Sequence, residues 1–156
     1  MKKITLIAAC FYLFTNACKK DENKEPQKSK TEFLCSGQWY LKVFNINPGV
    51  KIGNSTVTDF YATLPPCEKD DFQKFSPNGT AFTDEGPTKC DPSNPQIDEF
   101  IWAFDATESK LVFDKLPYDI SKLDANDLIL TKVVDGSEIF GGISGQSYKV
   151  TLNMTH

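Results

Sequence analysis

The chain has 156 residues, of which 40% are hydrophobic, and its 17 basic and 21 acidic side chains give a formal net charge of −4 at pH 7. Every basic residue is a lysine, and the chain has no arginine. Arginine is the side chain that binds phosphate and guanine through bidentate hydrogen bonds. An acidic chain without arginine is a poor candidate for binding nucleic acid or anionic lipid headgroups.

The N-terminus has the pattern of a secretory signal peptide. Lys2 and Lys3 are followed by an almost unbroken apolar stretch from Ile4 to Phe14, and small residues precede Cys18. The stretch is too short to span a bilayer, which needs about 20 residues. We therefore predict a cleaved signal peptide over residues 1–17, with an uncleaved membrane anchor as the alternative.

A cysteine directly after such a segment suggests a lipid anchor, and the arrangement resembles that of bacterial lipoproteins. The residues before Cys10 are closer to the preferred lipoprotein box, but cleavage there would leave too short an apolar core. We therefore expect the lipid, including palmitate, on Cys18. The resemblance implies a protein of the bacterial cell envelope that is tethered to the outer membrane without crossing it.

Residues 18–32 are predicted to form a flexible, lipid-anchored tether, because they are rich in charged side chains and contain no large apolar one. This charged run resembles the export signals of Bacteroidota lipoproteins that reach the cell surface, and an ordinary solvated linker is the alternative. Loss of residues 1–17 leaves 15 basic against 21 acidic side chains, a net charge of −6. The folded domain is expected over residues 33–156, long enough for one sizeable core.

This domain has the pattern of an all-β fold. No segment shows a long helical apolar period, so we expect no helix beyond a single turn within residues 57–64. Eight short strands separated by turn residues predict a small antiparallel up-and-down barrel, which leaves no exposed edge. The predicted strands are Gln38–Asn45, Asp71–Ser76, Thr80–Glu85, Glu99–Asp105, Lys110–Asp114, Tyr118–Leu123, Asp127–Val134 and Gln146–Asn153.

The turn Pro77–Gly79 marks the clearest hairpin, because proline presets φ and glycine accepts the positive φ that such a loop requires. The resulting register pairs Phe75 with Ala81 and brings Cys67 within one residue of facing Cys90. In an exported protein this arrangement predicts a disulfide, with two free thiols as the alternative. Closing a loop of about 24 residues would stabilise the fold by roughly 3 kcal/mol in the chain-entropy model.

Five segments, in order, resemble the lipocalin-like domain of Bacteroidota lipoproteins: Leu34–Leu41, Cys67–Asp71, Phe75–Thr80, Lys89–Pro92 and Trp102–Phe104. The resemblance covers about residues 33–153 and implies a lipocalin-like barrel. True lipocalins close the barrel floor with an arginine over the tryptophan of the first strand. Because this chain has no arginine, either a lysine such as Lys149 substitutes or the floor is built differently.

The sequence does not favour an enzyme. Its only histidine is His156, the last residue, which we expect to fray, and this argues against catalytic triads and histidine-ligated metals. Cys35 is expected to be a free, buried thiol without a histidine partner. The glycine-rich stretch over residues 141–145 precedes a strand, so it reads as a flexible loop instead of a phosphate site. We therefore predict no catalysis, no cofactor and no metal.

Acidic residues form the one other cluster that could bind an ion or take part in catalysis. They could bind Ca²⁺, supply a carboxylate pair for glycoside hydrolysis, or form a plain solvated face, although their spacing matches no known calcium loop. Six of them could gather at the foot of the hairpin: Glu68, Asp70, Asp71, Asp84, Glu85 and Asp91.

Aromatic side chains are the main candidates for a binding site. Either they line an apolar pocket or they simply fill the barrel, since an eight-stranded barrel can hold one small ligand or be packed solid. We therefore predict a binding protein for a small apolar or amphipathic ligand; the alternative is an interaction subunit, with a solid barrel, that docks on an envelope protein or glycan. The seven candidates are Trp39, Phe75, Phe82, Trp102, Phe104, Phe113 and Tyr148.

Overall fold

The computed structural model of the chain describes residues 28–113 and 115–156, so the predicted signal peptide, Cys18 and most of the predicted tether lie outside the described residues. Nine strands account for most of the described chain. They are β1 (Gln38–Ile52), β2 (Ser55–Asp59), β3 (Phe72–Phe75), β4 (Thr80–Asp84), β5 (Ile97–Phe104), β6 (Lys110–Phe113), β7 (Leu116–Leu123), β8 (Asp127–Asp135) and β9 (Ser147–Thr155).

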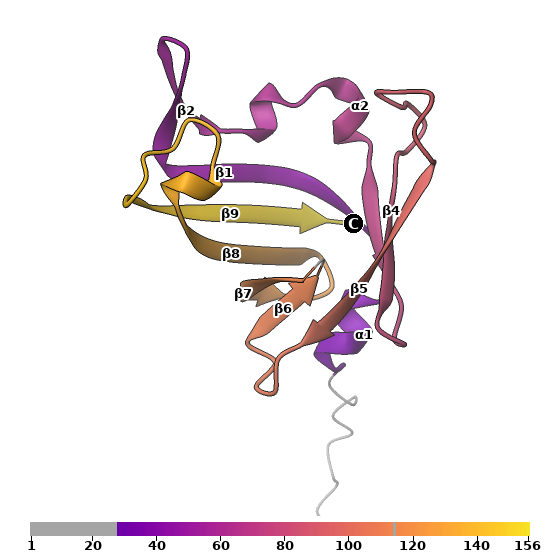
Figure 1. Cartoon of the computed structure of the whole chain (residues 1–156). Helices are drawn as coiled ribbons and strands as arrows, with labels where there is room; N and C mark the ends of the chain where they lie inside the picture. The colour runs from indigo at the N-terminus through magenta and orange to yellow at the C-terminus, as the bar shows by residue number, and fades with distance from the viewer. Residues whose placement is uncertain (1–27, 114) are drawn as a thin grey trace, which may run out of the picture.

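The strands form one antiparallel sheet in the order β2-β1-β3-β4-β5-β6-β7-β8-β9, and an additional pairing of β1 with β9 closes it. Eight strands therefore make a closed barrel, which confirms the predicted all-β fold, and β2 pairs with β1 outside the ring (Figure 1). The hairpin register is also confirmed, because Phe75 pairs with Ala81 and Gln73 with Thr83.

The first strand is longer than predicted. It runs past Asn45 to Ile52 and turns back through Gly53, at φ +59°, into β2, a strand that the sequence did not reveal. Pro48 and Gly49 ordinarily discourage a strand interior. They are tolerated here because the pairing of β1 with β2 is interrupted between Asn45 and Val50, so that these residues lie in an irregularity of the ladder.

The described part of the chain has four short helices, of which the sequence predicted one. The expected turn is confirmed as η1 (Tyr61–Thr63), but α1 (Lys30–Leu34), α2 (Pro66–Lys69) and η2 (Gly136–Glu138) were not expected. Each spans about one turn, too short for a helical apolar period to show. No helix of the described residues is long and apolar enough to cross a membrane.

Helix α1 begins within the residues predicted to form the tether. Ser29 caps the helix through a reciprocal capping box with Glu32, and Leu34 at its end is fully buried. Trp39 Nε1 donates a hydrogen bond of 2.8 Å to the Leu34 carbonyl oxygen. The helix thus closes one end of the barrel, called here the floor, and lies at the lower right of the view in Figure 1.

Of the two alternatives expected for the floor, a substituting lysine or a floor built differently, the structure has the second. His156 does not fray: its ring lies 4.0 Å from the Trp39 ring, measured between centroids, and Nδ1 is 2.9 Å from the Gln38 carbonyl oxygen. Lys149 does not take this place, since it pairs with Asn47 on β1, away from the floor. The floor is therefore built by a histidine from the end of the chain.

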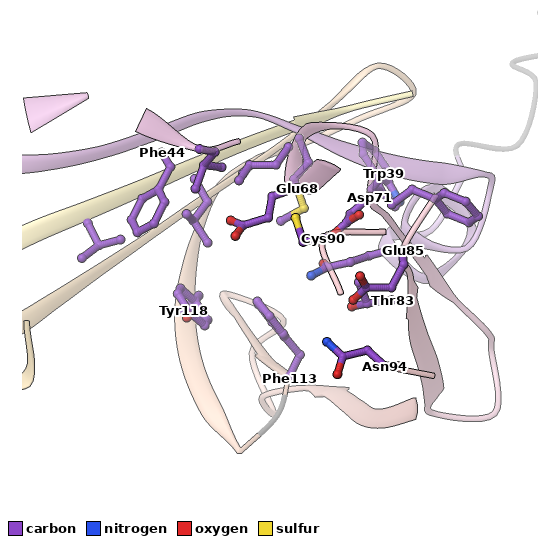
Figure 2. A pocket seen from close by; sticks show the side chains of 17 residues that line it. Trp39, Phe44, Glu68, Asp71, Thr83, Glu85, Cys90, Asn94, Phe113 and Tyr118 are labelled. Carbon is purple, nitrogen blue, oxygen red and sulfur yellow. The ribbon is translucent and has the colours of Figure 1, made fainter. Parts of the chain in front are cut away.

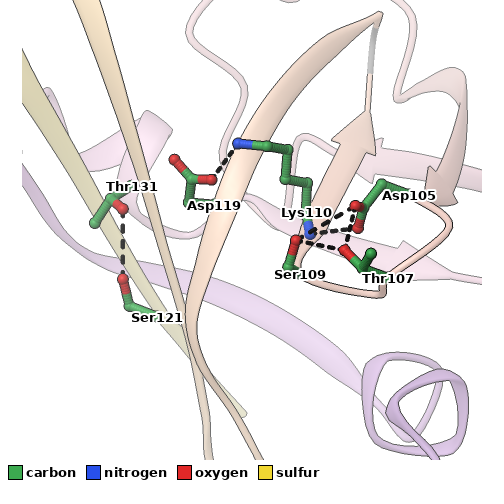
Figure 3. A network of polar contacts seen from close by, with 7 residues as sticks. All are labelled: Asp105, Thr107, Ser109, Lys110, Asp119, Ser121 and Thr131. Carbon is green, nitrogen blue, oxygen red and sulfur yellow. Dashed lines mark hydrogen bonds and ion pairs between the residues drawn. The ribbon is translucent and has the colours of Figure 1, made fainter.

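Polar contacts outside the barrel hold the short strands together, as Figure 3 shows. Asp105 organises the turn between β5 and β6 by accepting hydrogen bonds from the Lys110 backbone N–H at 2.7 Å and the Thr107 hydroxyl at 2.6 Å. These bonds favour the charged carboxylate and lower its pKa to about 2. Lys110 pairs in turn with Asp119 across β6 and β7.

Candidate functional site

A cavity of about 610 Å³ occupies the barrel (Figure 2). Its size is in the range of small-molecule sites, roughly 300–1,000 Å³. The apolar part of its lining, called here the apolar wall, consists of Trp39, Leu41, Phe44, Leu64, Phe72, Phe113, Tyr118, Val150, Leu152 and Met154.

Strand alternation creates most of the apolar wall. Val150, Leu152 and Met154 occupy every second position of β9, so their side chains point to the same face of the sheet. Across the lumen, the Phe113 and Tyr118 rings are stacked with centroids 4.8 Å apart. Regular strand geometry therefore supplies a continuous apolar surface facing the cavity.

The remaining lining is polar and lies at one side of the cavity. Three carboxylates, called here the acidic edge, come from different places: Glu68 from α2, Asp71 from the residue before β3, and Glu85 from the residue after β4. In Figure 2 Asp71 and Glu85 lie across the cavity from Phe44 and Tyr118, and Glu68 lies between the two sides. Gln73, Thr83 and Asn94 complete the polar side, together with Cys90.

The acidic edge is held by the predicted disulfide. Cys67 on α2 is bonded to Cys90, which precedes β5, with Cα atoms 5.2 Å apart, so the prediction is confirmed. The two chain segments also approach closely at Gly86, where a Cβ would lie 2.5 Å from the Asp70 carbonyl oxygen. Cys35 is a free thiol, as predicted, but it is only half-buried against the core.

Asp71 is the most perturbed group of the acidic edge. Burial first, and then the negative charges of Glu85, Asp70, Glu68 and Asp84, together raise its pKa to about 6. Among the ion pairs of residues 28–113 and 115–156, none involves a carboxylate of the acidic edge. The cavity thus carries concentrated negative charge that the described residues do not neutralise.

Two buried acceptor atoms on this side lack a hydrogen-bond partner within the described chain. They are Asp71 Oδ1 and Gln73 Oε1, and both residues border the cavity. Leaving a buried acceptor unpaired costs about 1–3 kcal/mol. A donor supplied from the cavity would remove that cost.

The six predicted carboxylates do not act as one group. Asp70 accepts two hydrogen bonds from Thr88, which lower its pKa, whereas Asp91 accepts two from Ser93. Asp84 accepts from Gln96 Nε2 at 2.7 Å. No set of three or more His, Cys, Asp or Glu side chains in the described residues has the geometry of a metal site.

A second cavity of about 480 Å³ adjoins the first, because Phe44, Tyr118 and Val150 border both. Lys132 also borders it, and its Nζ lies 6.0 Å from the Tyr118 ring centroid. Lys132 pairs with Val150 in the alternation of β8 and β9, which places it on the inner face of the barrel. The described residues therefore place one lysine, Lys132, beside the second cavity together with Glu138, apart from the three carboxylates of the first cavity.

The seven predicted aromatic residues have four different environments. Trp39 and Phe113 border the larger cavity. Phe75, Trp102 and Phe104 pack in the core near the floor, and Tyr148 belongs to a second buried cluster with Ile46, Val50 and Val134. Phe82 alternates with buried Ala81 on β4 and contacts the Phe72 ring, with centroids 6.3 Å apart.

Sequence reasoning missed several lining residues. Phe44, Val150 and Leu152 carry the signal of strand alternation, which predicts an inner face but not an unfilled space beside it. Lys132 breaks the apolar alternation of β8, and this break is the signal that could have revealed a charge inside the barrel.

Comparisons with known proteins do not assign the chain to a family. No protein-family model matches the sequence, and no curated protein matches it. Among solved structures, the fold is similar to that of a DUF4847 family protein from Bacteroides vulgatus, with 14% identity and a TM-score of 0.39 over 80% of this chain and 96% of that one. So distant a likeness says nothing about the site, which is therefore interpreted from its own residues.

Proposed function

We propose that the chain is a membrane-anchored binding protein of the bacterial envelope whose barrel takes up a small apolar or amphipathic ligand. The observation that carries the proposal is the 610 Å³ cavity with its apolar wall. Removing apolar surface from water contributes roughly 25 cal/mol per Å², so a ligand that covers this wall gains affinity from burial alone. A closed barrel keeps the wall largely preformed, which reduces the entropic cost of binding.

Binding without catalysis is the simpler use of this cavity. The side chains on its polar side are carboxylates, amides and a threonine hydroxyl, and the only histidine of the sequence contacts Trp39 at the floor. Hydrogen-bonding groups at one side of an apolar pocket orient a ligand and give specificity.

The proposal is tested with a fluorescent apolar probe and two matched variants. Val150→Phe adds volume inside the barrel, at a residue that borders both cavities. Val133→Phe adds the same volume on β8 at a position that is 65% exposed. We expect stoichiometric probe binding that the first substitution abolishes and the second leaves unchanged. Equal binding by all three proteins would place the probe outside the barrel and contradict the proposal.

Membrane attachment through Cys18 is the second part of the proposal, supported by the apolar stretch and small residues that precede it. Metabolic labelling with palmitate tests it in a bacterial host. We expect Cys18→Ala to lose the label and Cys10→Ala to keep it. The reverse result would move the cleavage site to Cys10.

One observation favours an interaction subunit as the second candidate. On β5, Ile97 and Ile101 point outward and are 45% and 67% exposed, although large aliphatic side chains are usually buried. They pair with Asp84 and Thr80 of β4 and so lie at either end of the outward face that carries Phe82. Loss of partner binding on Ile101→Asn, with probe binding retained, would support this candidate.

A further inference from the structure

We infer that the ligand of the barrel is a cationic amphiphile, with its apolar body against the apolar wall and its ammonium group beside the acidic edge. This inference rests on the proposed function and adds the chemical class of the ligand. It depends on the position of the charges, the unpaired acceptors and the continuity between the apolar and polar sides of one cavity.

The first argument is the charge beside the cavity. Glu68, Asp71 and Glu85 converge from α2, the start of β3 and the end of β4, and the disulfide between Cys67 and Cys90 fixes two of these segments together. Carboxylates so placed repel one another unless a cation lies among them. Because the ion pairs of the described residues lie elsewhere, the matching cation is expected from the ligand.

The second argument is hydrogen bonding. Asp71 Oδ1 and Gln73 Oε1 are buried acceptors without a partner in the described part of the chain, and both side chains border the cavity. An ammonium group carries several N–H donors and no acceptor, so it satisfies acceptors and neutralises carboxylates at the same time. A carboxylate headgroup would offer further acceptors and negative charge to this side.

The third argument is the position of Lys132, the one cation that borders the barrel interior in the described residues. Lys132 borders the second cavity and not the first, and it packs toward the Tyr118 ring and shares that cavity with Glu138. An anionic ligand would have to place its headgroup there, against one lysine. Three carboxylates in the larger cavity favour the cationic class.

The experiment compares three probes with the same alkyl chain: decylamine, decanol and decanoate. Each is titrated calorimetrically, below its micelle concentration, into the chain from residue 18 onward with Cys18→Ala, which retains the whole closed barrel. We expect decylamine to bind about tenfold or more tightly than either other probe, the gain typical of a charge-assisted hydrogen bond.

Two variants locate the headgroup. Asp71→Asn and Glu68→Gln should each weaken decylamine about fivefold to tenfold and leave decanol unchanged, since decanol lacks the charge. Glu99→Gln makes the same change on the outer, exposed side of β5 and should have no effect. Lys132→Gln should not weaken decylamine.

The pH dependence gives a readout that a purely structural role would not produce. Protonation of Asp71, which faces Glu68 and Asp70 from the α2 side and Glu85 and Asp84 from the β4 side, removes a charge from the acidic edge. Decylamine affinity should therefore fall as the pH drops below about 6, and Asp71→Asn should flatten this dependence.

The outcomes separate the inference from the proposed function. Equal affinity for decylamine and decanol, or a preference for decanoate that Lys132→Gln removes, would overturn the cationic class while leaving a binding barrel. Binding of none of the three probes would overturn the proposed function and this inference together.

Discussion

The ring of His156 lies on the ring of Trp39, with centroids 4.0 Å apart and planes inclined by 35°. His156 also bonds the backbone of the first strand through Nδ1, and its Nε2 lies 3.2 Å from the Ser36 hydroxyl. The contact joins the end of β9 to the start of β1 at the floor, where the barrel closes. A residue at the end of the chain thereby completes the fold.

We expect His156→Ala to destabilise the protein by about 0.5–1.5 kcal/mol, the value of an aromatic pair beyond its buried area. Urea unfolding measures the change, and Trp39 emission should shift because its ring loses its cover. Lys149→Ala, at an exposed position on β9, is the control and should leave stability unchanged. Equal stability of the His156→Ala variant would show that the floor does not depend on this contact.

Gly37 should be coupled to His156. A Cβ at residue 37 would lie 2.8 Å from His156 Nδ1, closer than atoms pack, so Gly37→Ala must displace the ring. A double-mutant cycle measures this coupling. The alanine should cost markedly less stability in the His156→Ala background than in the wild type. Additive effects would contradict the packing of the imidazole against Gly37.

Reduction of the disulfide should lower the free energy of unfolding by about 2–4 kcal/mol. Cys67→Ser with Cys90→Ser should reproduce this loss, because the bond closes a loop with a sequence separation of 23. Cys35→Ser is the control, since that thiol is free. Peptide mapping without reductant should recover a Cys67–Cys90 linked pair; a peptide that joins Cys35 to either residue would refute the assignment.

Asp71→Asn should stabilise the protein at neutral pH although it weakens the proposed site. The folded-state pKa of Asp71 is raised to about 6 from its ordinary value of 3.8. The folded state therefore favours the protonated carboxyl, and stability is lost as the pH rises from about 4 to about 6. Asparagine does not ionise and should recover about 1 kcal/mol at pH 7, less than the whole shift implies because solvent screens a half-buried group.

The measurement is chemical denaturation at pH 4 and pH 7. The advantage of the variant should shrink toward zero at pH 4, where the wild-type carboxyl is protonated. A pH-independent advantage would attribute the effect to something other than ionisation.

Features fixed by local chemistry could be predicted from the sequence. The turn at Pro77–Gly79 determines the register of Phe75 with Ala81, and that register leads to the disulfide. The sequence also allowed six acidic residues to gather at the foot of the hairpin, and three of them, Glu68, Asp71 and Glu85, border the cavity.

Features that depend on residues distant in the sequence could not be predicted in this way. The contact of His156 with Trp39 joins residues 117 positions apart, and neither residue type indicates it. Strand β2 follows an irregular stretch at Pro48 and Gly49, where local propensity argues against pairing. The cavity itself depends on how eight strands close, because side-chain alternation gives an inner face but not the volume left inside it.

Methyl NMR of the labelled protein, titrated with decylamine, tests the central claim most directly. Methyl groups of Leu41, Val150, Leu152 and Met154 border the cavity, whereas those of Ile97 and Ile101 lie on the outer face of β5. The account predicts saturable shift changes for the cavity methyls and none for the two isoleucines. Shift changes confined to Ile97 and Ile101 would contradict it and identify the outer face as the binding surface.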